Sequence, residues 1–192
     1  GSVGVTMNNA IYARDNITVN GVTGGASNTG IDYSVALIST AGNVILNGGA
    51  TDGRAVYNSV ASTITANNMY INGTTTLAPA WVLQVGALTI NTGVVGGNIA
   101  LTGNVVGIPG AAGGIYQIGT ITGASGSNIS FTSNNNISQN GAINLAANTS
   151  GAAANITYDT TSGTKASNIT TGTLTIGAGT NNSGINYIVK SA

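Results

Sequence analysis

Apolar residues recur along this chain in pairs two positions apart, and each pair is flanked by Gly, Asn, Ser or Thr. The segments that carry the pattern include VGVTM, ITVNG, NVILNG, NMYING, ALTINT, NIALTG, NISFTS, AINLAA, NITYDT, TLTIGA and INYIVK. A period of two is that of a β-strand with one buried face. The paired residues then point inward, the residue between them points outward, and Gly or Asn turns the corner.

Self-similar short strands separated by turn residues indicate a repeat architecture, in which each unit buries its apolar face by stacking on the next. Stacked strands lie about 4.8 Å apart, so like charges in register would repel along the stack. Asn, Thr and Ser can stack without this cost, and Asn side chains can also hydrogen bond. The pattern therefore predicts an all-β protein, a parallel β-helix (β-solenoid) of about nine or ten coils with roughly 20 residues each.

An antiparallel β-sandwich or jelly-roll module is the alternative fold. Asn-Gly pairs are typical of hairpin turns, and they occur at Asn20-Gly21, Asn47-Gly48, Asn72-Gly73 and Asn140-Gly141. The predicted strands are shorter than hairpins favour and their spacing is irregular, which favours the solenoid.

Residues 1–192 are expected to form a single domain. The two proline sites, LAPAW at 77–81 and GIPGAAGG at 107–114, are interpreted as loops because the strand pattern resumes on either side of each. Both ends of the sequence read as strands without a cap. We therefore expect the chain to be a segment of a longer protein.

Charge is nearly absent from the chain. Only 4% of the 192 residues are charged, with four Lys and Arg against four acidic residues and a net charge of zero. No basic cluster exists that could bind nucleic acid or an anionic membrane, and no apolar run is long enough for a membrane-spanning helix. The sequence therefore predicts no nucleic-acid partner and no membrane insertion.

The side chains that usually carry catalysis are also missing. The chain has no His, Cys or Glu, which removes the common nucleophile–base pairs and the usual zinc ligands. A carboxylate pair could hydrolyse glycosides, so Asp15, Asp32 and Asp52 are the only catalytic candidates considered. Asp15 adjoins Arg14, and Asp52 lies two residues before Arg54, as in solvated turns. We predict no enzyme activity, no catalytic residue, no metal site and no cofactor.

Aromatic residues are sparse, and their place in the pattern divides them. Phe131, Tyr158 and Tyr187 occupy the second inward position of their strands and are expected in the core. Tyr70 lies between two inward residues and should point outward, while Trp81 falls in a proline-flanked loop. Tyr70 and Trp81 are therefore the candidate surface-contact residues.

Eight Asn-x-Ser/Thr sequences are candidate glycan acceptors, although many would arise by chance in a chain so rich in Asn, Ser and Thr. They are Asn16, Asn72, Asn128, Asn136, Asn148, Asn155, Asn168 and Asn181.

The segments GSNISFTSNNNISQNGAINLAANTS, GNVILNGG, GNIALTGN and GTLTIGAG resemble the filamentous haemagglutinin-like repeats of large bacterial exoproteins. Those repeats share the apolar-x-apolar strand, the Asn or Gly corner and the Asn-x-Gly step, and the resemblance spans most of the chain. It implies a right-handed parallel β-helix in an adhesin of the two-partner secretion type, outside or on the surface of a Gram-negative bacterium. The secretion motifs of that family are not matched, which favours a repeat or stalk segment.

These observations favour a non-catalytic structural and adhesive segment of a surface exoprotein. Its expected partner is a host or neighbouring-cell surface or a glycan. An alternative is a self-assembling subunit of an extracellular filament, sheath or biofilm matrix that associates end to end. A polysaccharide-acting β-helix enzyme is the least favoured reading, since it would depend on the few Asp residues alone.

Overall fold

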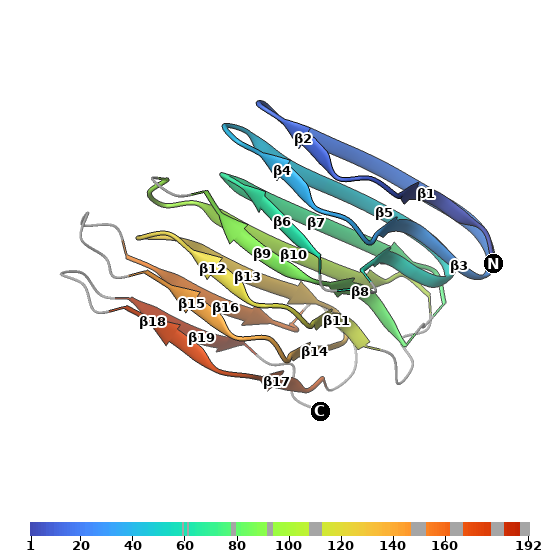
Figure 1. The fold of residues 1–192 in the computed structure, drawn as a ribbon. Coiled ribbons are helices and arrows are strands. Elements are labelled where there is room, and N and C mark those ends of the chain that lie inside the picture. The colour runs from blue at the N-terminus through green and yellow to red at the C-terminus, as the bar shows by residue number, and fades with distance from the viewer. Residues whose placement is uncertain are drawn as a thin grey trace.

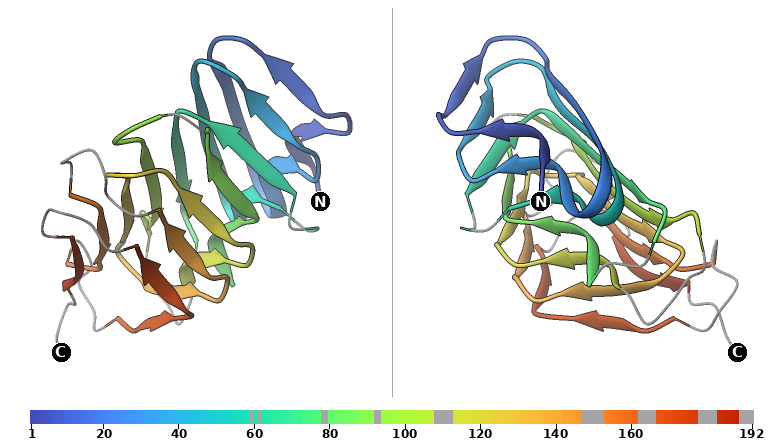
Figure 2. Two further views of the ribbon diagram at one scale, coloured as in Figure 1. Left: turned by 60° about the vertical axis from the view of Figure 1, so that its left-hand side comes forward. Right: turned by 90° about the vertical axis from the view of Figure 1, so that its right-hand side faces the viewer.

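The computed structural model describes residues 1–58, 60, 62–77, 80–91, 94–107, 113–146, 153–161, 167–177 and 183–188, with backbone alone at 26 and 27. Over these residues the protein is all-β, with strands and turns and no helix. Each coil of the chain crosses three faces in turn, and the coils stack one upon another along a common axis (Figures 1 and 2).

The first face contains the amino-terminal halves of two long strands, β3 (Ile17–Tyr33) and β5 (Asn43–Tyr57). Five further strands continue it: β7 (Asn68–Thr75), β10 (Asn98–Val105), β13 (Asn128–Ser133), β16 (Asn155–Asp159) and β19 (Gly184–Ile188).

The second face contains the carboxyl-terminal halves of β3 and β5, which bend around the corner from the first. The others are β1 (Val3–Met7), β8 (Trp81–Val85), β11 (Gly113–Gln117), β14 (Asn136–Gln139) and β17 (Ile169–Thr171).

The third face is a separate seven-stranded sheet. Its strands are β2 (Ile11–Ala13), β4 (Leu37–Ser39), β6 (Thr63–Ala66), β9 (Ala87–Ile90), β12 (Ile121–Gly123), β15 (Ile143–Leu145) and β18 (Leu174–Ile176). Every strand pair among the described residues is parallel. The fold is therefore a parallel β-helix, as predicted, and the sandwich alternative is wrong.

The coils are longer and fewer than the sequence suggested. Ile17 and Ile185 stand in the same column, 168 residues and six coils apart, which averages 28 residues per coil. The spacing varies, because Gln117 pairs with Gln139 after 22 residues and Leu88 pairs with Ile121 after 33. About six turns therefore replace the nine or ten expected.

Three of the four Asn-Gly pairs mark a narrow corner between the first two faces, where a hairpin turn was the alternative. Gly21, Gly48 and Gly73 lie inside strands and stack in register. A Cβ on Gly48 would lie only 2.0 Å from the carbonyl oxygen of Ala55, on the adjoining face. Glycine is needed here because two backbones approach too closely for any side chain.

The core of the first face consists of two inward columns that run from coil to coil. The first column is Ile17, Val44, Met69, Ile99, Ile129, Ile156 and Ile185, and the second is Val19, Leu46, Ile71, Leu101, Phe131, Tyr158 and Tyr187. Most of these side chains are fully buried. Because burial of one such side chain stabilises a fold by about 1.5–3 kcal/mol, the columns are a principal source of stability.

An asparagine ladder runs along the edge of the same face, where each strand begins. Its members are Asn16, Asn43, Asn68, Asn98, Asn128 and Asn155. Side-chain oxygens accept hydrogen bonds from the next asparagine at 2.8–3.4 Å, through the side-chain amide or the backbone N–H. A second ladder joins Asn20, Asn47 and Asn72 at 2.8 and 2.9 Å. The uncharged amides thus bond the coils together, as the composition predicted.

Candidate contact surface

The second face carries an unbroken outward column, one residue per coil. Its members in register are Thr6, Asp32, Tyr57, Gln84, Tyr116, Ser138 and Thr170. Two further side chains contact the tyrosines of this column, Arg54 and Trp81. Together with Asn140, which bonds Tyr116, these residues form what we call the aromatic strip: Arg54, Tyr57, Trp81, Gln84, Tyr116 and Asn140.

Arg54 lies over the ring of Tyr57, with the guanidinium carbon 4.3 Å from the ring centroid. This cation–π contact holds the side chain against the face. The Nε atom is buried without a hydrogen-bond partner, and the terminal nitrogens make no hydrogen bond or ion pair within the described part of the chain. Asp32, which stands next to Tyr57 in the column, accepts a 3.2 Å hydrogen bond from Ser34. Arg54 therefore has donors that no described carboxylate occupies.

Trp81 stacks on Tyr116, with ring centroids 5.1 Å apart and planes inclined by 19°. The prediction that Trp81 lies in a loop is wrong, because it begins strand β8. Its ring occupies the space that a Cβ at Gly113 would need, since that atom would fall 1.7 Å from the indole. The hydroxyl of Tyr116 accepts a 3.2 Å hydrogen bond from the side-chain amide of Asn140. The pair is therefore held by contacts within β8 and β11 and by Asn140, the residue that follows β14.

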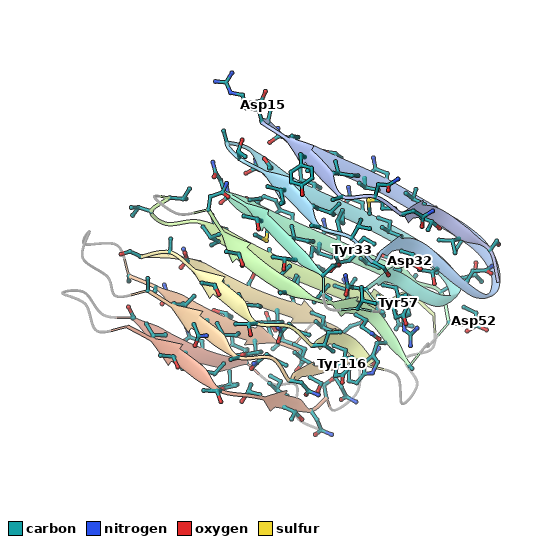
Figure 3. The ribbon with its side chains drawn as sticks, viewed as in Figure 1. Asp15, Asp32, Tyr33, Asp52, Tyr57 and Tyr116 are labelled. Carbon is teal, nitrogen blue, oxygen red and sulfur yellow. The ribbon has the colours of Figure 1, made fainter. Side chains whose placement is uncertain are left out.

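Tyr70 lies on the outward side of the first face, as predicted, between Ile45 and Ala100 in register. It belongs to a different face from Trp81, so the structure does not bring the two candidates together. Tyr116, which stacks on Trp81, and Tyr57, which lies in the same column as Tyr116, were not predicted from the sequence. Figure 3 shows both on the second face.

The interior aromatic residues form a stack of their own. Phe131 and Tyr158 are fully buried with centroids 4.8 Å apart, and Tyr187 continues the stack at 5.1 Å. Their inward orientation was predicted, although Tyr187 is 49% exposed because no further described strand covers it. The hydroxyl of Tyr158 donates to Gln139 at 3.1 Å, and burial raises the pKa of this phenol far above its usual value.

Tyr33 is the other buried phenol, and it belongs to the second face. Its hydroxyl accepts a 3.3 Å hydrogen bond from the backbone N–H of Gly86. Burial raises its pKa strongly, while that hydrogen bond acts in the opposite direction. Tyr33 is therefore a neutral part of the core.

The three aspartates considered for catalysis do not form one site. Asp15 is exposed at one end of a coil, and Figure 3 places it far from Asp32 and Asp52. Asp52 lies near the bend of β5, where it pairs with residue 26 in register. The described residues contain no group of three or more His, Cys, Asp or Glu side chains able to hold a metal ion.

The candidate glycan acceptors divide according to the asparagine ladders. Asn72, Asn128 and Asn155 donate their side-chain amides to the preceding asparagine. The side-chain oxygens of Asn16 and Asn136 each accept a hydrogen bond, and the described bonds of Asn168 involve its backbone alone. The amide nitrogens of these last three have no described partner. Asn148 and Asn181 lie outside the described residues.

A hollow of about 410 Å³ opens where the third face turns toward the first. Its lining is Thr89, Ile90, Val94, Val95, Thr122, Gly123, Ala124, Ser125 and Ala146. These walls carry no titratable side chain and no aromatic ring. The hollow is therefore less suited than the aromatic strip to recognise a polar partner.

No protein-family model, curated protein or solved structure was found to match this chain. No part of the described chain forms a helix that could cross a membrane. The fold places the chain in the class of β-helix repeat proteins.

Proposed function

We propose that this chain is a non-catalytic structural and adhesive segment of a bacterial surface exoprotein, similar to filamentous haemagglutinin repeats and located outside the cell. The observation that carries the proposal is the parallel stack of the described strands, in which coils pack through apolar columns and successive asparagines from Asn16 to Asn155 hydrogen bond from coil to coil. Such a stack makes a stiff spacer, because each coil is fixed by the coils on both sides. Its outward faces supply the surface for attachment.

Adhesion of coated beads tests this proposal. Beads that carry the purified chain are expected to attach to bacterial or host cells, or to immobilised glycans, more often than beads that carry the same chain after thermal unfolding. Equal retention of both kinds of bead on all these surfaces would contradict an adhesive role.

A self-assembling subunit is the second candidate, and one observation favours it. Strand β19 leaves Ile185, Tyr187 and Ile188 41–49% exposed, although the first two continue buried columns. A strand edge that no described residue covers can pair with a further strand, either of the same polypeptide or of another copy. Electron microscopy of the purified chain separates the candidates, since regular fibres indicate polymerisation and monodisperse particles indicate a stalk segment.

The absence of catalysis is part of the proposal and has its own test. The chain is incubated with a panel of neutral and acidic polysaccharides, and the release of reducing ends is measured. We expect no release above that of a heat-unfolded sample. Release that disappears in Asp15→Asn, Asp32→Asn or Asp52→Asn would instead establish a glycoside hydrolase.

A further inference from the structure

We propose that the aromatic strip binds a neutral polysaccharide chain that runs parallel to the axis of the β-helix. The inference rests on the proposed adhesive function and names the partner that this surface fits. It is carried by three features of the second face: the spacing of its rings, the polar groups beside them and the balance of charge.

The spacing of the strip follows from the register. Tyr57, Gln84 and Tyr116 occupy the same column on three successive strands. Since neighbouring strands lie about 4.8 Å apart, the two tyrosines are separated by roughly 9.6 Å along the axis. That separation is close to the length of two sugar units in an extended polysaccharide. A linear glycan aligned with the axis could therefore contact Tyr57 beside Arg54 and, two sugar units farther along, Tyr116 beside Trp81.

The side chains of the strip combine apolar and polar surface. Tyrosine and tryptophan offer a rigid apolar ring with one polar group, which suits a ligand whose ring has apolar C–H positions and hydroxyls around it. The amide of Gln84 and the terminal nitrogens of Arg54, which have no partner among the described residues, supply hydrogen-bonding groups beside the rings. The Gln84 amide donates 3.0 Å to the carbonyl of Asn58, so its oxygen remains able to accept.

The charges at the strip favour a neutral ligand. The carboxylate of Asp32 stands one strand from Tyr57, and the guanidinium of Arg54 lies over the same ring. A polyanion would be attracted by one group and repelled by the other. Sugar hydroxyls, in contrast, can donate to the carboxylate and accept from the guanidinium.

The only tryptophan of the chain lies in the strip, so its fluorescence reports binding there directly. The folded chain is titrated with hexasaccharides of β-1,4-glucan, β-1,3-glucan and α-mannan. We expect at least one of them to change the emission of Trp81 in a saturable manner. The affinity should stay nearly constant as salt rises from about 50 to 500 mM, because charge pairs contribute little.

Variants of the strip locate the site. Tyr57→Ala and Tyr116→Ala are each expected to weaken binding roughly tenfold or more, as loss of an aromatic anchor does at other interfaces. Tyr70→Ala, an outward tyrosine on the first face, is the matched control and should bind as the unmodified chain does. Tyr116→Phe keeps the ring that stacks on Trp81 and should retain most of the affinity. Circular dichroism of each variant shows whether weaker binding reflects a loss of folding.

The outcomes separate this inference from the proposed function. No emission change with any of the three neutral probes overturns the inference, as does an equal loss in Tyr70→Ala. Heparin is titrated in parallel, and a response to heparin alone that fades with salt would show a polyanion site and would also overturn the inference. Bead adhesion that persists in Tyr57→Ala and Tyr116→Ala would leave the adhesive function in place and exclude the strip as its site.

Discussion

Asn98 shows how a single side chain can join three coils. Its amide lies 3.3 Å from the oxygen of Asn68, and its own oxygen accepts from Asn128 at 3.4 Å. An amide can both donate and accept, so the same residue can be repeated in register without limit. A carboxylate only accepts and carries charge, and a methyl group does neither. The ladder therefore needs a side chain that both donates and accepts hydrogen bonds, as the asparagine amide does.

Asn98→Asp tests the ladder. The carboxylate loses the donor to Asn68 and faces its oxygen, so we expect a loss of about 1–3 kcal/mol in the free energy of unfolding, measured with guanidinium at pH 7. The deficit should shrink below about pH 4, where protonation restores one donor. Asn144→Asp is the control, because this side chain is exposed and makes no described hydrogen bond, and it should change stability by less than about 0.5 kcal/mol.

The ladders also predict where a sugar could be attached. Modification of Asn72, Asn128 or Asn155 would remove an amide donor that links two coils. The side-chain nitrogens of Asn16, Asn136 and Asn168 have no partner among the described residues. If the chain from its native host shows hexose increments by intact-mass measurement, peptide mapping should find them on Asn16, Asn136 or Asn168. Hexose increments found mainly on Asn72, Asn128 or Asn155 would contradict this prediction.

At the scale of the element, the period-two pattern predicts the strands of the first face well. It fails more often on the other faces, because their second inward position is often small or polar. Gln117 and Gln139 are buried there in register, and Ser39 is fully buried as the second inward residue of β4. An apolar-x-apolar rule overlooks such strands. This is why the coils looked shorter than they are, and why Tyr57 and Tyr116 escaped notice.

The contribution of an inward column to stability can be measured by shortening one residue at its centre. Leu101 is fully buried between Ile71 and Phe131 in register. Leu101→Ala should lower the free energy of unfolding by about 2–5 kcal/mol, because the rigid strands around it cannot close the cavity. The neighbouring outward residue gives the control, and Thr102→Ala should cost less than about 1 kcal/mol in the same guanidinium titration.

At the scale of the whole molecule, the near absence of charge leaves few groups whose titration can alter stability. The described groups with a resolved shift are Tyr33 and Tyr158, and burial raises the pKa of both. A raised folded-state pKa means that the folded chain keeps its proton where the unfolded chain, with a tyrosine pKa near about 10, loses it. The contribution of these two tyrosines to the free energy of unfolding is therefore complete below about pH 10 and declines at higher pH.

Alkaline titration checks this sign. Above about pH 10 the free energy of unfolding should fall by at most about 1.4 kcal/mol per pH unit for each of the two tyrosines. Tyr158→Phe removes one of the two tyrosines with a raised pKa and should make the decline shallower. A decline with the same slope in Tyr158→Phe would refute the assignment.

The pairing of each strand with the coil just before it has a consequence for how the chain could be made. A polypeptide that emerges with its amino end first can add one coil at a time, because the template for each new coil is already in place. Pairing strands are separated by only about one coil of chain, so little conformational entropy is lost when each loop closes. If the chain emerges through a pore, each completed coil would also be too wide to return through it, so folding would favour movement in one direction.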